Sequence, residues 1–157
     1  MSKPGAIIAA RIKTELPELA LLVERATEGW ERAKSQNDTF YLDSVALNLH
    51  SFYSGLEKIF EKIAATVDGS VPSAPNWHQE LLSQMSMEIP EVRPAVISQE
   101  LRDMLEDYRG FRHVVRNVYT YHLNPEKVER LISDIEPVLE KLIAELNAFA
   151  TFLQEAG

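Results

Sequence analysis

The sequence predicts an all-α protein, an antiparallel up-down four-helix bundle with a short extra helix in its long middle connection. Over four long stretches apolar residues recur three and four positions apart, whereas the alternation typical of strands is almost absent. Only 6 Gly and 8 Pro occur in 157 residues, so few positions interrupt a helix. Because one core typically serves roughly 100–200 residues, we expect a single domain over residues 1–157.

The first two long helices are predicted from their apolar stripes. The first stripe consists of Ile8, Ile12, Leu19, Val23, Ala26 and Trp30. Pro17 lies within it and lacks a backbone N–H, so we expect a kink or a break near Leu16. The second helix is expected to begin near Asp38, an N-cap candidate, and to end at about Val67. Its stripe consists of Leu42, Val45, Leu49, Phe52, Leu56, Ile59, Phe60 and Ile63.

The middle connection contains two loop stretches and one short helix. Residues 68–76 contain two Pro, two Ser, one Gly and one Asp, a composition that favours a loop. Residues 86–97 contain two further prolines and are expected to be weakly structured. Between these stretches, residues 77–85 are predicted to form a short helix capped by Asn76.

Two further long helices complete the predicted bundle. The third is expected to begin at Ser98 and to end near Tyr121. Asn124 as N-cap and Pro125 at the first helical position then begin the last helix. The connection is very short, so these two helices must lie side by side. Their apolar stripes include Leu101 and Leu105 in the third helix and Val128, Leu131, Ile132, Ile135, Leu139, Leu142, Leu146, Phe149 and Leu153 in the last.

Composition excludes several classes of function. The chain has no cysteine, which rules out disulfides, thiolate metal sites and cysteine nucleophiles. Its net charge of −8 disfavours non-specific binding to nucleic acid or to anionic membranes. The sequence carries no export signal and no apolar run near the ~20 residues of a membrane span. We therefore expect a cytoplasmic protein that does not associate with membranes.

Positive charge is nevertheless concentrated on one side of the third long helix. Arg109, Arg112, His113 and Arg116 lie at i, i+3, i+4 and i+7, so all four project from the same side. We call these four residues the basic face. A polyanion that binds this acidic chain needs such a local patch, and we expect RNA contacts here.

Arg116 and His122 form a candidate catalytic pair at the end of the same helix. Six residues of continuous helix give about 9 Å of rise and about 240° of rotation, so the two converge only if the helix frays near Tyr121. A neutral histidine can take the proton of a 2′-hydroxyl, and an arginine can stabilise charge at phosphorus. This pair suits metal-free cleavage of RNA. The amide of Asn117 can orient the phosphate or the histidine, and Tyr119 can stack on a base, as can Tyr121.

The spacing alone leaves a second interpretation open. A basic helix end on the surface, followed by a histidine near a helix cap, produces the same pattern. We expect a structural role for His50 and a surface position for His78. Glu57 and Glu61 share a helix face, but a di-metal bundle site also needs Glu-x-x-His on paired helices, which is absent. No Gly-rich phosphate loop occurs either, so we expect neither a metal nor a cofactor.

The segment Arg116–His122, Arg-Asn-Val-Tyr-Thr-Tyr-His, resembles the HEPN motif. That motif is an arginine, usually followed by a polar residue, and then a histidine after four to six intervening positions. Residues 108–117 before it and the apolar-striped helix after it are most similar to the HepT branch. HepT proteins are ribonuclease toxins that are paired with a minimal nucleotidyltransferase (MNT) antitoxin.

The resemblance implies a metal-independent endoribonuclease toxin of a type VII-like HEPN/MNT pair, with tRNA as one candidate target. It implies a homodimer in which the two motifs face one another and form one composite RNA cleft. Within the motif, Arg116 and His122 would be catalytic and Asn117 would support them. The alternative is a non-catalytic HEPN-like scaffold that binds a nucleotidyltransferase, which the net charge of −8 favours.

The resemblance also implies neutralisation by AMPylation, in which the MNT partner transfers AMP to a tyrosine beside the motif. That tyrosine usually lies two residues after the histidine, where this chain has Asn124. The candidate acceptors are therefore Tyr119 and Tyr121. The missing tyrosine also motivates the scaffold alternative.

Overall fold

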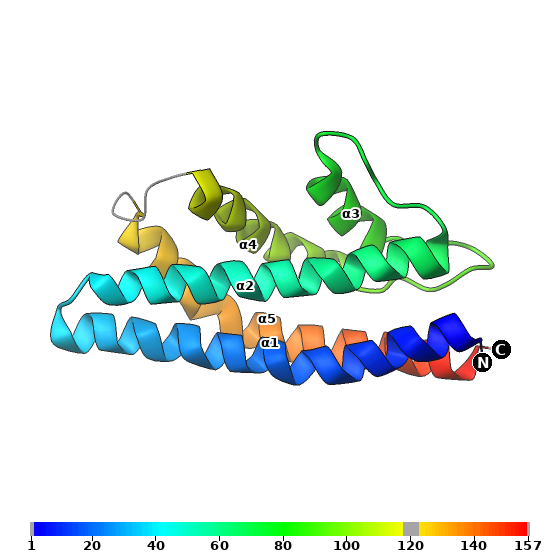
Figure 1. Ribbon diagram of the computed structural model, residues 1–157, viewed down its shortest axis with the longest axis horizontal. Coiled ribbons are helices and arrows are strands. Elements are labelled where there is room, and N and C mark those ends of the chain that lie inside the picture. Colours follow the sequence, from blue (N-terminus) through cyan, green and yellow to red (C-terminus); the bar gives the residue numbers. More distant parts are fainter. Residues whose placement is uncertain (1, 118–122, 157) are drawn as a thin grey trace.

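The computed structural model describes residues 2–117 and 123–156 and is all-helical, as predicted (Figure 1). The helices are α1 (Lys3–Gln36), α2 (Phe40–Ile63), the π-helix η1 (Ala64–Asp68), α3 (Trp77–Met85), α4 (Gln99–Asn117) and α5 (Pro125–Glu155). Within the described residues, the only bridge of β type joins Ile89 and Arg93. None of the helices in these two ranges has the length and apolar character that a bilayer span requires.

The four long helices run alternately in opposite directions, so the two ends of the chain lie together (Figure 1). α1 packs mainly against α2 and α5, whereas α4 packs against α2 and α5, and α3 packs against α4 and α2. This arrangement places α3 and α4 together on the side of α2 that faces away from α1 (Figure 1). The short extra helix of the prediction therefore lies beside the helix that carries the basic face.

The predicted apolar stripes lie in the core. Every stripe residue predicted for α2, α4 and α5 is buried, and in α1 only Trp30 is half-buried instead. Ser98 caps α4, because its hydroxyl accepts a hydrogen bond from the backbone N–H of Leu101 at 3.1 Å. Asn124 caps α5 in the same way through Glu126, at 2.9 Å. Two predicted helix starts are thus confirmed.

Of the kink or break predicted near Leu16, the break is excluded, since α1 continues unbroken through Pro17. Pro17 lies on the exposed side of the helix, where water can satisfy the carbonyl that has lost its N–H partner. Leu16 and Leu19 on either side of it are buried against the other helices. Tertiary packing of these apolar residues keeps the helix continuous despite the missing hydrogen bond.

The predicted caps of α2 and α3 are also partly wrong. α2 begins at Phe40, with Thr39 rather than Asp38 as the N-cap residue, although Asp38 Oδ1 accepts a hydrogen bond from the Phe40 N–H at 3.0 Å. Asn76 does precede α3, but its side chain makes no capping hydrogen bond. Its backbone, at φ −95° and ψ 25°, is not in the extended conformation that a capping side chain needs.

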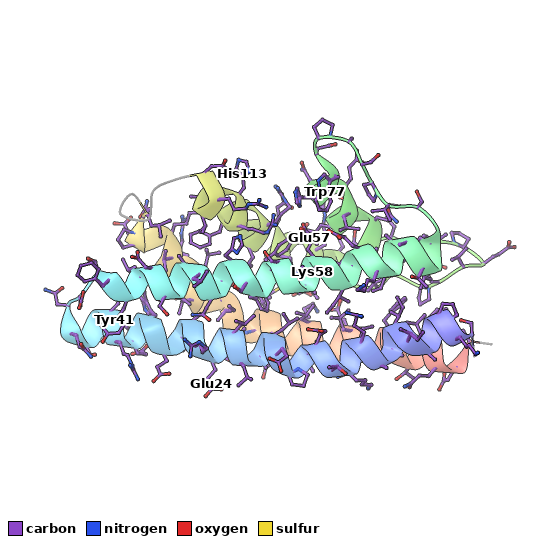
Figure 2. All side chains as sticks on the ribbon, viewed as in Figure 1. Glu24, Tyr41, Glu57, Lys58, Trp77 and His113 are labelled. Atoms are coloured by element: carbon purple, nitrogen blue, oxygen red, sulfur yellow. The ribbon has the colours of Figure 1, made fainter. Side chains whose placement is uncertain are left out.

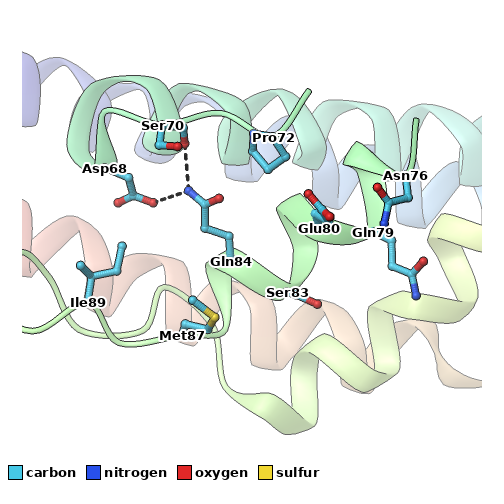
Figure 3. Close-up of a pocket in the computed structure, with 10 residues that line it drawn as sticks. All are labelled: Asp68, Ser70, Pro72, Asn76, Gln79, Glu80, Ser83, Gln84, Met87 and Ile89. Atoms are coloured by element: carbon cyan, nitrogen blue, oxygen red, sulfur yellow. Dashed lines mark hydrogen bonds between the residues drawn. The ribbon is translucent and has the colours of Figure 1, made fainter. Parts of the chain in front are cut away.

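Residues 86–97, predicted to be weakly structured, are held in place by the buried side chain of Arg93. Its guanidinium donates to the carboxylate of Asp68 in η1, from Nε at 2.6 Å and from Nη2 at 2.8 Å. It also donates to the backbone carbonyls of Gln84, Met87 and Pro94. The side-chain amide of Gln84 donates to Asp68 and to the carbonyl of Ser70 (Figure 3). The side chain of Arg93 thereby joins the connection to η1, which directly follows α2.

A buried tyrosine fixes α4 against α5. Tyr108 is 2% exposed, and its hydroxyl donates to the backbone carbonyl of Leu131 at 2.6 Å. We expect Tyr108→Phe to lower the free energy of unfolding by about 1 kcal/mol, the net value of such a hydrogen bond, as measured by urea denaturation. Tyr41→Phe is the matched control, because the hydroxyl of Tyr41 bonds Gln36 at the surface. Equal stability of Tyr108→Phe and wild type would contradict the prediction.

Candidate functional site

The basic face of α4 borders a hollow between α4 and α3. The hollow has a volume of about 270 Å³ and is lined by all four residues of the basic face together with Asn117 and His78 of α3. Glu57 of α2 lies beneath the hollow. Trp77 of α3 and His113 of α4 lie on the same side of α2 as Glu57 (Figure 2). The structure therefore brings together the four residues that the helical spacing predicted to share a face.

Two of the three arginines on the basic face are paired with carboxylates. Arg109 Nε donates to Glu106 Oε1 at 3.0 Å, and this hydrogen bond raises the pKa of the Arg109 guanidinium. Arg112 Nε donates to Ser54 Oγ of α2 at 2.8 Å, and Arg112 Nη1 lies 3.9 Å from Glu57 Oε1. These contacts hold both guanidinium groups in place and offset part of their charge.

Glu57 and His78 form a pair that the sequence analysis did not assign to the site. The side chain of Glu57 is 4% exposed, and its Oε2 lies 2.8 Å from His78 Nδ1. His78 is half-buried rather than on the surface as predicted, and its ring stacks on Trp77 with the centroids 3.5 Å apart. One signal was available, because Glu57 stands in the buried part of α2 between Leu56 and Ile59, where a carboxylate needs a partner.

His50 of α2 lies near the same cluster. Burial, followed by the positive charges of Arg112 and Arg116, lowers the pKa of its imidazole from the ordinary value of 6.5. The folded protein thus resists protonation of His50, while the unfolded chain accepts the proton near pH 6.5. The unfolded state binds more protons as the pH falls below that value, so acidification weakens the fold.

We therefore expect wild-type protein to lose stability as the pH falls through and below 6.5, and His50→Gln to lose less. Urea denaturation on either side of pH 6.5 measures both losses. The comparison is between the two pH dependences, so a change in overall stability from the substitution does not affect it. The same loss in both proteins would show that other groups cause the acid sensitivity.

The chain matches the sequence model of the family described as HepT-like protein over residues 44–153. The matched region covers more than two thirds of the chain and contains most of α2, all of α3 and α4, and the residues that line the hollow. The chain belongs to the HepT-like family. No curated protein and no solved structure matches it.

In this HepT-like protein, the predicted motif lies partly outside the described residues. Arg116 is exposed near the end of α4, which the structure describes as far as Asn117. His122, Tyr119 and Tyr121 lie outside the described residues. The convergence of Arg116 and His122 therefore stays a prediction. Asn117 donates its amide to the backbone carbonyl of His113 at 2.7 Å, so this amide group is engaged within α4.

The two glutamates considered for a metal site have other surroundings. Within residues 2–117 and 123–156, no group of three His, Asp or Glu side chains is placed to hold a metal ion. Glu57 contacts His78 and Arg112, whereas Glu61 lies beside Lys62 and Arg11 at a separate hollow. The candidate site is thus a cationic surface, which favours anions, and the carboxylate of Glu57 lies buried beneath it and offsets part of its charge.

Proposed function

We propose that this HepT-like protein is a metal-independent endoribonuclease toxin. The proposal rests on the Arg116–His122 segment. This segment begins with the last residue of the basic face and lies within the region that the family model matches. The basic face supports it, because the phosphates of RNA need a cationic surface on a protein with a net charge of −8. RNA, with tRNA as a candidate, is the proposed substrate.

The proposed reaction is transesterification at a phosphodiester of RNA. His122 takes the proton of the 2′-hydroxyl, whose oxygen then bonds to the adjacent phosphorus. Arg116 holds the non-bridging oxygens and stabilises the charge that develops on them. The bond from phosphorus to the 5′-oxygen breaks, and that oxygen takes up a proton as it leaves. The products are a 2′,3′-cyclic phosphate and a 5′-hydroxyl end.

The proposed assembly is a homodimer in which both motifs face one composite cleft, and the proposed antitoxin is an MNT-type nucleotidyltransferase. Transfer of AMP from ATP to the hydroxyl of Tyr119 or Tyr121, with release of pyrophosphate, would add a charged group close in sequence to Arg116 and block access of RNA. Asn124 stands where a HepT-type acceptor tyrosine usually lies, and it caps α5 through Glu126. Intact mass of the protein after incubation with the partner and ATP, followed by peptide mapping, identifies the modified tyrosine.

The test of the nuclease is cleavage of total RNA and of tRNA in EDTA by wild type and by His122→Ala. Mapping of the fragment ends shows the chemistry. We expect only the wild type to cut and the ends to be 2′,3′-cyclic phosphate or 3′-phosphate. Equal cutting by both proteins would contradict the role of His122, and no cutting by unmodified wild type would overturn the nuclease.

A second candidate function is a non-catalytic scaffold that binds a nucleotidyltransferase. The pairing of Arg109 with Glu106 and of Arg112 with Glu57 favours it, because both carboxylates reduce the charge offered to RNA. The scaffold predicts tight binding of the partner, no cleavage of RNA, and no toxicity of the wild type expressed alone. Toxicity that disappears in His122→Ala would decide for the nuclease.

A further inference from the structure

The hollow between α3 and α4 has a lining that the proposed catalytic pair does not explain. Five of its six lining residues are arginines or histidines, the sixth is Asn117, and none is a carboxylate. The chain as a whole has more acidic than basic residues, so this lining departs strongly from its surroundings. His78 comes from a different helix, α3, and meets the basic face of α4 across the hollow.

The buried carboxylate of Glu57 holds both sides of the hollow. Its Oε2 is 2.8 Å from His78 Nδ1 on α3, and its Oε1 is 3.9 Å from Arg112 Nη1 on α4. A carboxylate accepts hydrogen bonds, so His78 donates from Nδ1 and keeps Nε2 for another partner. Stacking on Trp77 holds the same ring on its flat side. The orientation of His78 is thus set by two contacts on α2 and α3.

We propose that this hollow is a phosphate-binding subsite for the RNA backbone, with His78 as a contact residue and Glu57 as its positioning residue. The inference rests on the proposed function for its substrate class. Guanidinium and imidazole N–H groups match the oxygens of a phosphate. No aliphatic residue and no Phe, Tyr or Trp lines the described hollow, and every lining side chain carries N–H groups that can donate to phosphate oxygens. The subsite binds phosphate independently of sequence.

Of the lining residues, Arg116 serves the phosphate that is cut, whereas His78 reaches the hollow from α3 and is assigned to a neighbouring phosphate. His78 contacts a phosphate that is not the one being cut, so its loss should raise KM for RNA and leave kcat unchanged. Glu57 acts through His78. If Glu57 were only a negative charge beneath the hollow, its removal would strengthen anion binding instead. Positioning and simple charge therefore predict opposite signs for Glu57→Gln.

The test is binding of a 2′-O-methyl RNA oligonucleotide, which lacks the reactive hydroxyl, followed by fluorescence anisotropy at fixed salt. We expect His78→Gln and Glu57→Gln each to raise the Kd for the oligonucleotide about tenfold, because each weakens one contact with a phosphate. The double variant should bind no more weakly than either single one, because the two residues act as one unit. Lys58→Gln is the control, since Lys58 is an exposed cation of α2 that lines a different hollow.

Competition by inorganic phosphate separates a subsite for phosphate from a general effect on RNA. We expect phosphate to displace the oligonucleotide from wild type and less from His78→Gln. Tighter binding by Glu57→Gln would overturn the positioning role, and unchanged binding by His78→Gln would overturn the subsite. If Glu57→Gln fails to fold, His78→Gln alone tests the subsite. His78 lies on a short helix at the edge of the bundle, so we expect its substitution to leave the fold intact (Figure 1).

The subsite and the nuclease can fail separately, because the oligonucleotide cannot be cut. If the wild type binds the oligonucleotide with the expected dependence on His78 but cleaves no RNA, the proposal of a nuclease is overturned and the proposal of a subsite stands. If the wild type cleaves RNA and His78→Gln has the same Kd and KM as the wild type, the proposal of a subsite is overturned and the proposal of a nuclease stands. Wild type that does not bind the oligonucleotide overturns the subsite.

Discussion

Arg116→Ala is expected to lower kcat for RNA cleavage by about 100- to 1,000-fold, the usual cost of removing one donor that stabilises developing charge. Arg116 is exposed at the end of α4, lines the hollow, and makes no ion pair with any residue that the structure describes. No hydrogen bond between described residues involves the Arg116 side chain. The effect of the substitution should therefore appear in the rate and not in the stability.

Two variants give this prediction its controls. Arg116→Lys keeps the charge but loses the two-pronged donor, so it should recover only part of the rate. Arg25→Ala removes one exposed arginine from α1, which lies on the other side of α2 from α4, and should leave the rate unchanged (Figure 1). Single-turnover cleavage measures all three. An Arg116→Ala protein as fast as wild type would remove Arg116 from the reaction.

Asp68→Ala is expected to lower the free energy of unfolding by about 3–5 kcal/mol, the cost of leaving a buried charge without its partner. The side chains of Arg93 and Asp68 are 0% and 2% exposed. Arg93 makes two hydrogen bonds to this carboxylate, and the remaining ones go to backbone carbonyls that carry no full charge. Native domains have only about 5–15 kcal/mol of stability, so this loss is severe.

Urea denaturation with circular dichroism measures the effect. Arg32→Ala is the matched control, because Arg32 pairs with Glu28 at the exposed surface, where such a pair contributes about 0–1 kcal/mol. A loss for Asp68→Ala no larger than that of Arg32→Ala would show that the connection is held by its buried apolar residues. Val96 and Ile97, at 2% and 1% exposed, are the residues that would then hold it.

Most of the fold was predictable because the signals that specify it are local. The period of apolar residues identified the buried face of each long helix, and Ser98 and Asn124 identified two helix starts through hydrogen bonds to the next few residues. The break that the sequence offered as one outcome at Pro17 is absent for the opposite reason. A proline lowers the local helical tendency, but burial of Leu16 and Leu19 against other helices outweighs it.

The candidate site was predictable only in part. The basic face follows from helical spacing within one segment, so its four residues could be placed together from the sequence. Glu57 and His78 are 21 residues apart, and Arg112 and Ser54 are 58 apart. No periodic pattern links residues on separate helices, because their distance depends on how the helices pack.

The sequence by itself determined the helical class, the buried stripes and the cationic side of α4, since each depends on residues within a few turns of one helix. Tertiary structure decided that a carboxylate of α2 lies beneath that side, that a histidine of α3 meets it, and that Arg93 reaches Asp68 across 25 residues. These contacts arise where three helices and a connection converge. Their energies come from burial, which exists only once the chain has folded.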